Sequence, residues 1–199
     1  MFGKIFGSSA PADTPQEIRI SIRLNARLQP VQRGEYFEDP LDHALRSEDL
    51  GEVVGGGTVL ADDPDGMIAC DIEMALHKDI DDTVGRIVAF LDQAGAPAGS
   101  ALMRPGHEPV SFGLWQGMAV FLNGTDLPDA VYAGADINET IDGLVQALSG
   151  LGELRGHWQG GLGTSLYFYG PEFADMSAAA AAYAATDPLC GQCQITQIA

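Results

Sequence analysis

The sequence is poor in positive charge. Its 199 residues include ten Lys and Arg against 28 Asp and Glu, which gives a formal net charge of −18 at pH 7. A surface this acidic repels nucleic-acid phosphates and anionic membrane surfaces. We therefore expect neither nucleic acid nor a membrane among the partners. The same acidity can attract a basic protein partner, although it is also a common means of keeping a protein soluble.

Cysteine and long apolar runs are also scarce. Three cysteines, an odd number in a chain with no export signal, argue against a disulfide framework. The N-terminal residues contain no apolar run long enough for a signal peptide or a spanning helix. These two features predict a cytoplasmic protein with reduced thiols. We interpret residues 1–16 as a flexible tail.

Motifs that carry chemistry are largely missing. Gly55-Gly56-Gly57 has neither the lysine nor the following helix of a phosphate loop, so we interpret it as a bulge or a close backbone approach. The four histidines show no metal-ligand spacing. Cys190 and Cys193 have the spacing of a dithiol or of half a zinc site, but they follow a predicted helix instead of preceding one. We expect no catalytic residue, no metal and no cofactor.

A repeated pattern is the most informative feature that is present. Segments 79–95 and 136–152 share six identical positions of 17. Each begins with an Asp suited to cap a helix, Asp79 or Asp136, and continues with apolar residues at helical spacing. The similarity predicts a duplicated domain.

The remaining periodicities complete two similar units. Ile18 to Leu28 alternates strictly between apolar and polar residues, which is typical of a half-buried strand. Further strands are predicted at 52–61, 67–77, 100–104, 117–123, 153–159, 164–170 and 193–198, and helices at 39–50, from 80, from 137 and at 173–185. The order is βαββαβ twice. We therefore expect an α+β fold of two ferredoxin-like βαββαβ units, residues 17–106 and 107–199, with antiparallel sheets and helices packed on one face.

This fold leaves one face of each sheet open. On the open face of the first unit, the arginines of the first strand should lie opposite Asp71 and Glu73. These arginines are Arg19, Arg23 and Arg27. The open sheet faces also offer a surface for a homodimer.

The loop 123–129 is the best candidate for a binding site. It follows a strand and precedes the helix from 137, a position where backbone amides can meet a ligand, although its plain role is to turn the chain. The candidate ligand or partner-binding residues are Asn123, Gly124, Asp126, Asp129 and Trp158. The alternative is an enzyme that uses Asp126 and His157, which requires the loop to fold over the 153–170 hairpin.

Several stretches resemble a known group of proteins. These stretches are Gly55 to Leu60 before Cys70 to Glu73, then Phe121 to Thr125 and Leu166 to Gly170. They resemble tandem ferredoxin-like, ACT-like bacterial proteins of unknown function, some of which resemble toxin-immunity proteins. The resemblance implies a non-catalytic binding or interaction protein, of immunity type or sensing a small molecule. Its partner is then a basic protein or a small-molecule ligand.

Overall fold

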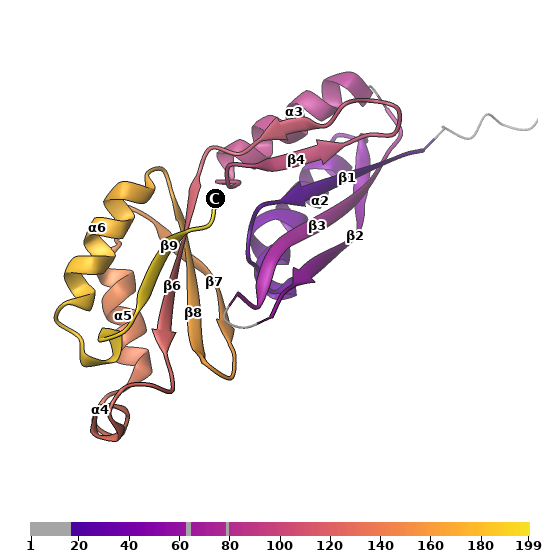
Figure 1. The fold of residues 1–199 in the computed structure, drawn as a ribbon. Helices are drawn as coiled ribbons and strands as arrows, with labels where there is room; N and C mark the ends of the chain where they lie inside the picture. The colour runs from indigo at the N-terminus through magenta and orange to yellow at the C-terminus, as the bar shows by residue number, and fades with distance from the viewer. Residues whose placement is uncertain (1–16, 63–64, 79) are drawn as a thin grey trace, which may run out of the picture.

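Two antiparallel sheets organise the chain, which has an α+β fold (Figure 1). The computed structural model describes residues 17–62, 65–78 and 80–199. The predicted tail of residues 1–16 and the predicted helix cap Asp79 lie outside these residues. The predicted α+β class with antiparallel sheets is confirmed. None of the helices in the described ranges is long and apolar enough to cross a membrane.

The first half of the chain, residues 17–112, builds a sheet with the order β2-β3-β1-β4-β5. Its strands are β1 (Ile18–Leu24), β2 (Gly51–Leu60), β3 (Met67–Leu76), β4 (Ser100–Met103) and β5 (Val110–Phe112). Its helices are α1 (Pro30–Arg33), the π-helix η1 (Gly34–Glu38), α2 (Asp39–Ser47) and α3 (Ile80–Gln93). Strand β5 follows residue 106, so the first sheet extends beyond the boundary that the sequence predicted.

The second half, residues 116–199, builds a sheet with the order β7-β8-β6-β9. Its strands are β6 (Gln116–Asn123), β7 (Glu153–Gln159), β8 (Gly163–Gly170) and β9 (Gln194–Gln197). Its helices are α4 (Asp129–Gly134), α5 (Ile137–Ala147), α6 (Phe173–Ala184) and the short 3-10 turn η2 (Pro188–Cys190). The elements that the sequence did not predict are all short: α1, η1, β5, α4 and η2.

Each sheet has a core on its helical face. In the first half, Ile22 of β1 lies opposite Ile72 of β3, and both are fully buried with side chains from α2 and α3. In the second half, Val120 and Leu166 pair across β6 and β8 beneath α5 and α6 (Figure 1). Alternation along the strands and the 3.6-residue period along the helices place these apolar residues together.

The other face of the second sheet is covered by the first half. Tyr167 and Tyr169 of β8 point away from α5 and α6, yet they are 0% and 1% exposed. The Tyr169 hydroxyl accepts a hydrogen bond from the backbone N–H of Arg27 at 2.7 Å, and the Tyr167 hydroxyl donates to the carbonyl of Asp65. The prediction of an open face is therefore wrong for this sheet. Of the two sheet faces predicted to be open to a homodimer, only that of the first sheet remains.

A buried arginine also joins the two halves. Arg155 of β7 donates from Nη1 to the carbonyl oxygen of Ala94 at 2.9 Å, beyond the end of α3. Its guanidinium lies 4.3 Å from the ring centroid of Trp115 and 4.8 Å from that of Tyr36. Since arginine has no acceptor and a flat hydrophobic face, it can satisfy carbonyls and stack on rings at once. The halves therefore meet through specific contacts.

The predicted arginine network on the first sheet is correct at one position. Arg23 donates two hydrogen bonds to Asp71, at 2.7 and 3.0 Å. Arg19 lies opposite Ala75 and pairs with Glu17 instead.

The prediction for Arg27 is wrong. Strand β1 ends at Leu24, so Arg27 lies beyond the strand, where it pairs with Asp65 at 2.8 Å. Within the described residues, none of these arginines forms an ion pair with Glu73.

The repeated sequence pattern occurs on two helices in different positions. Helix α3 follows β3 as the second long helix of its half, whereas α5 follows β6 as the first of its half. Asp136 caps α5 as predicted, because its Oδ1 accepts from the N–H of Asn138 at 2.8 Å. The similarity therefore marks two amphipathic helices in non-equivalent positions and does not by itself establish a duplication.

The three glycines of β2 have a packing role. The π-helix η1 brings Arg33 and Glu38, five residues apart, to the same side, where their side chains pair at 2.8 Å. A Cβ at Gly56 would overlap the Glu38 carboxylate. The pairing of β2 with β3 is also irregular between Val53 and Gly55. The interpretation of these glycines as a bulge or close approach is consistent with this geometry.

Candidate functional site

The predicted loop 123–129 satisfies its own polar groups. Asn123 Oδ1 accepts from the backbone N–H groups of Thr125 and Asp126, at 2.9 and 3.0 Å, while its Nδ2 donates to the Asp126 carboxylate at 3.0 Å. The Tyr132 hydroxyl donates to the Asn123 carbonyl at 3.2 Å and accepts from the N–H of Leu127 at 3.0 Å. Such Asx bonds hold a tight turn. The side chains of this loop therefore shape the backbone.

The proposed enzyme site at Asp126 and His157 is not assembled. Asp126 is bonded to Asn123 beyond the end of β6. His157 lies on β7, opposite Leu166 of β8, so a whole strand separates it from β6. Within the described residues, no hydrogen bond or ion pair connects the two side chains.

Trp158 lies between the two halves. It is partly buried and packs against the first core. Gly66, at a φ of +63°, faces its ring, and a Cβ there would overlap the indole. Trp158 therefore contributes to the contact between the halves instead of forming an exposed aromatic patch for a partner.

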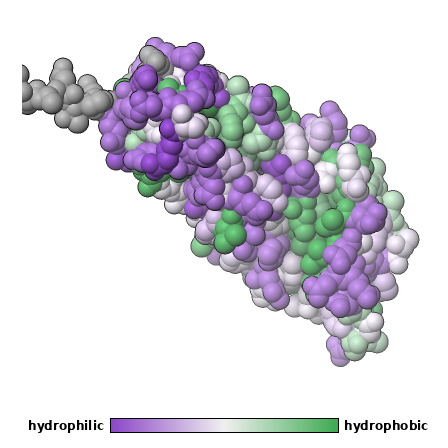
Figure 2. Space-filling model, turned by 180° about the vertical axis from the view of Figure 1, so that it is seen from behind, coloured by the Kyte–Doolittle hydropathy of each residue, from purple (hydrophilic) through white to green (hydrophobic). Residues whose placement is uncertain are grey.

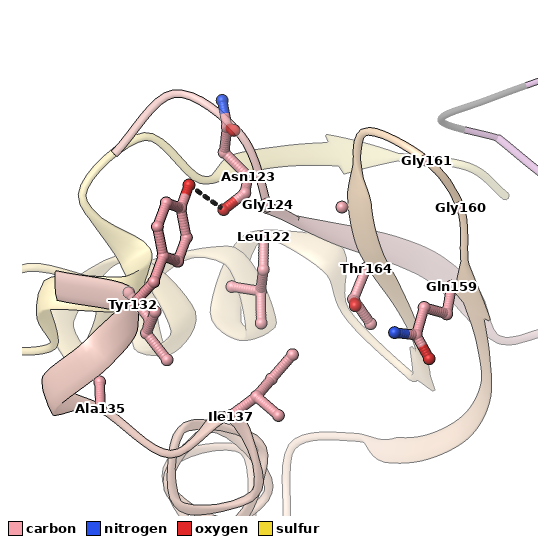
Figure 3. Close-up of a pocket in the computed structure, with 12 residues that line it drawn as sticks. Leu122, Asn123, Gly124, Tyr132, Ala135, Ile137, Gln159, Gly160, Gly161 and Thr164 are labelled. Carbon is pink, nitrogen blue, oxygen red and sulfur yellow. Dashed lines mark hydrogen bonds between the residues drawn. The ribbon is translucent and has the colours of Figure 1, made fainter. Parts of the chain in front are cut away.

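A pocket of about 350 Å³ lies beside the loop (Figure 3). Its sheet side is one row of side chains across three strands, because Leu122 of β6 is paired with Thr164 of β8, which is paired with Gln159 of β7. Tyr132 and Ile137, on either side of the α4–α5 connection, form the facing wall (Figure 3). Asn123 and Gly124 of the predicted site line this pocket, whereas Asp126 and Asp129 do not.

Glycines bring the end of β6 close to the β7–β8 turn. The N–H of Gly124 donates to the carbonyl of Leu162 at 2.9 Å. A Cβ on Gly124 would lie 3.0 Å from the Cα of Gly163, so a larger residue would push the two segments apart. Glycine at these positions therefore sets the closed end of the pocket. The sequence signal that marks this end is the glycine-rich turn 160–163.

The outer surface of the second half is acidic. Arg155 is the one Lys or Arg between residues 116 and 199, where nine Asp and Glu occur. Because Arg155 is enclosed at the contact with the first half, its charge offsets only Glu153, with which it pairs. The carboxylates of Asp129, Glu139 and Asp142 are exposed along α4 and α5. The view in Figure 2 shows largely hydrophilic side chains over both halves, with apolar side chains gathered in one area of the second half.

The two cysteines at the end of the chain have weakly acidic thiols. Cys190 is buried, and burial together with the nearby Cys193 and Asp187 raises its pKa to about 12. Burial also raises the pKa of Cys193. A thiol that stays protonated is a poor nucleophile and a poor metal ligand. Within the described residues, no group of three His, Cys, Asp or Glu side chains is placed to hold a metal ion.

Asp187 is the carboxylate with the most internal partners in this region. Its Oδ2 accepts from the hydroxyls of Thr140 and Tyr183, both at 2.8 Å, and its Oδ1 accepts from the N–H of Leu189. Burial acts against the charged form, but these hydrogen bonds outweigh it and lower the pKa of Asp187. The network ties α5, α6 and η2 together and is structural in character.

Comparisons with known proteins give no family. No protein-family model matches the chain, and no curated protein matches it. A solved structure of an unknown protein from Galdieria sulphuraria aligns with 92% of this chain and 98% of its own, at 9% identity and a TM-score of 0.29. A TM-score this low supports no conclusion about fold or function.

Proposed function

We propose that this protein is a non-catalytic binding protein that holds a basic macromolecular partner against the acidic outer surface of its second half. The observation that carries the proposal is the position of Arg155. It is the one Lys or Arg between residues 116 and 199, all of which the structure describes, and it is 7% exposed at the contact with the first half. The outer surface of this half therefore presents carboxylates without a lysine or arginine.

The charge distribution sets what such a surface can do. A field of one sign speeds the encounter with a partner of opposite charge and excludes partners of like charge. Attraction between exposed charges is screened when the Debye length falls to about 3 Å near 1 M salt. The partner class that fits is a basic protein. A basic toxin is the example that the resemblance to immunity-type proteins implies.

The fold we propose to carry this surface is a pair of ferredoxin-like units. Two strand orders support it: β2-β3-β1-β4 in the first half and β7-β8-β6-β9 in the second. In both, the two central strands come first and third along the chain, as a split βαβ arrangement requires. This part of the proposal concerns architecture and does not depend on the partner.

A salt-controlled capture experiment with paired variants tests the function. The protein is immobilised and exposed to lysate of its own organism at about 0.05 M and about 1 M salt. One variant neutralises three exposed acids of the second half: Asp129→Asn, Glu139→Gln and Asp142→Asn. A matched control neutralises three exposed acids of the first half: Glu35→Gln, Asp39→Asn and Glu73→Gln. Both variants lose the same charge.

The expected result is a basic protein that is retained at low salt and released at high salt. It should be retained by the control and lost, by about tenfold, from the second-half variant. Equal retention by the two variants would contradict the assignment to the second half. A partner that resists 1 M salt, or turnover of a small molecule abolished by Asp126→Asn, would contradict the proposed function.

A further inference from the structure

The pocket beside loop 123–129 is uncharged in a strongly acidic protein. Twelve residues line it, and none carries a charge, although the chain has a net charge of −18. Its volume of about 350 Å³ is within the range of small-molecule sites. Helices α4 and α5 contribute both to the pocket wall and to the proposed partner surface, but none of the exposed carboxylates lines the pocket. It therefore needs an explanation of its own.

The hydroxyl of Thr164 opens onto this pocket. Thr164 is 8% exposed, and its side chain is directed into the space between the facing walls (Figure 3). Among the residues that the structure describes, none forms a hydrogen bond with this hydroxyl. A hydroxyl that opens onto a pocket bonds to water there, and a ligand group that donates or accepts can replace that water. Thr164 is therefore ready to bond to a ligand.

Gln159 adds a second polar group next to Thr164. The two residues are paired across β7 and β8, and the Gln159 amide extends toward the same space (Figure 3). An amide both donates and accepts, as does a hydroxyl. Together they match a ligand group that carries a donor and an acceptor side by side.

Apolar side chains form the rest of the contact. Leu122 and Leu189 are buried beneath the pocket, and Ile137 is 40% exposed at its wall. These residues fit a short apolar body. A charged ligand would lose its hydration here without meeting an opposite charge, and the acidic surface would add repulsion for an anion.

We infer that this pocket binds a small neutral molecule in which a primary carboxamide, or an equivalent donor–acceptor pair, is attached to an apolar body. The polar group bonds to Thr164 and Gln159, and the apolar body lies against Leu122 and Ile137. The site shares no residue with the acidic surface, so either proposal can fail without the other.

Three probes of nearly equal shape test the ligand class. Benzamide, benzoate and benzylamine are titrated into ¹⁵N-labelled full-length protein, and amide chemical shifts are followed. Benzamide should bind with a dissociation constant of about 1 to 10 mM, the range that fragments of this size reach. The shifts should cluster at residues 122–124, 137 and 159–164. The two charged probes should bind at least about tenfold more weakly.

Two variants and a control test the site. Thr164→Val removes the hydroxyl at constant shape and should weaken benzamide binding about fivefold while leaving the melting temperature nearly unchanged, because no described residue bonds to this hydroxyl. Ile137→Phe fills the pocket from an exposed position and should abolish binding. Thr196→Val makes the same chemical change on exposed strand β9 and should leave binding unchanged.

The inference is wrong if benzamide does not bind at about 10 mM. It is also wrong if benzamide binding is unchanged in both Thr164→Val and Ile137→Phe. Benzoate or benzylamine binding as tightly as benzamide overturns the neutral class of ligand. A melting curve for each variant shows that a loss of binding does not reflect loss of the fold.

Discussion

Replacing Arg155 by alanine should weaken the contact between the two halves more than any change at the surface. The Arg155 side chain is 7% exposed. Its Nη1 reaches the carbonyl oxygens of Ala94 at 2.9 Å and Gly95 at 3.3 Å. Its guanidinium also stacks near the rings of Trp115 and Tyr36. Alanine would leave both carbonyls without this donor and the rings without their neighbour.

The magnitude follows from these contacts. Hydrogen bonds from a charged group to the buried carbonyls contribute about 2 kcal/mol together, and the stacking about 1 kcal/mol. The ion pair with Glu153 adds less than about 1 kcal/mol, because the Glu153 side chain is 57% exposed and water screens it. We therefore expect Arg155→Ala to lower the free energy of unfolding by about 3 kcal/mol. Glu153→Gln, the matched control, should lower it by less than about 0.5 kcal/mol.

Urea unfolding measures both variants. With an m-value of about 2 kcal/mol/M, the Arg155→Ala midpoint should fall by about 1.5 M. Trp115 and Trp158 both lie at the contact between the halves, so their fluorescence reports on this contact, and far-UV circular dichroism reports on the whole fold. A loss below about 1 kcal/mol for Arg155→Ala would refute the reasoning. An equal loss for Glu153→Gln would instead make the ion pair the dominant interaction.

Three further predictions concern stability. Arg23→Ala should lower the free energy of unfolding by less than about 1 kcal/mol in a urea titration, because its ion pair is half exposed; a loss of several kcal/mol would mean that this face is buried in an assembly. Gly66→Ala should lower the free energy of unfolding by about 2 kcal/mol or more, since φ is +63° and a Cβ would overlap the Trp158 ring. The loss should be smaller in a Trp158→Ala background, and equal losses in the two backgrounds would rule out the overlap. The pKa of Asp187 is lowered in the folded protein, so its carboxylate stabilises the fold above the unfolded pKa of about 4 and loses that contribution as the pH falls through the folded pKa. Asp187→Asn should therefore remove part of the loss of stability seen between pH 7 and pH 3. An unchanged pH profile would contradict the role of the Tyr183 hydrogen bond.

The candidate site was only partly predictable from sequence. Asn123 ends β6 and Gly124 follows it, so both line the pocket at the edge where loops gather. Thr164, Gln159 and Leu122 form its sheet side only through pairing across β6, β8 and β7. A single sequence without the strand register gives no reason to group these three residues.

Trp158 is another residue whose role the sequence left open. An isolated tryptophan near a strand is compatible with an exposed patch or with a packed contact. Its neighbour Gly66 is far away along the chain, and local pattern does not connect the two. The choice depended on where the first half meets the second sheet.

The sequence by itself determined the local elements and the charge of this protein. Strict alternation from Ile18, the Asp136 cap and the 3.6-residue period of the helices depend on backbone geometry and near neighbours, so they can be read directly. Only the tertiary structure decided that both faces of the second sheet are buried and that Arg155 is enclosed. Those outcomes depend on contacts such as that of Arg27 with Tyr169, 142 residues apart, and no local periodicity encodes a contact at that separation.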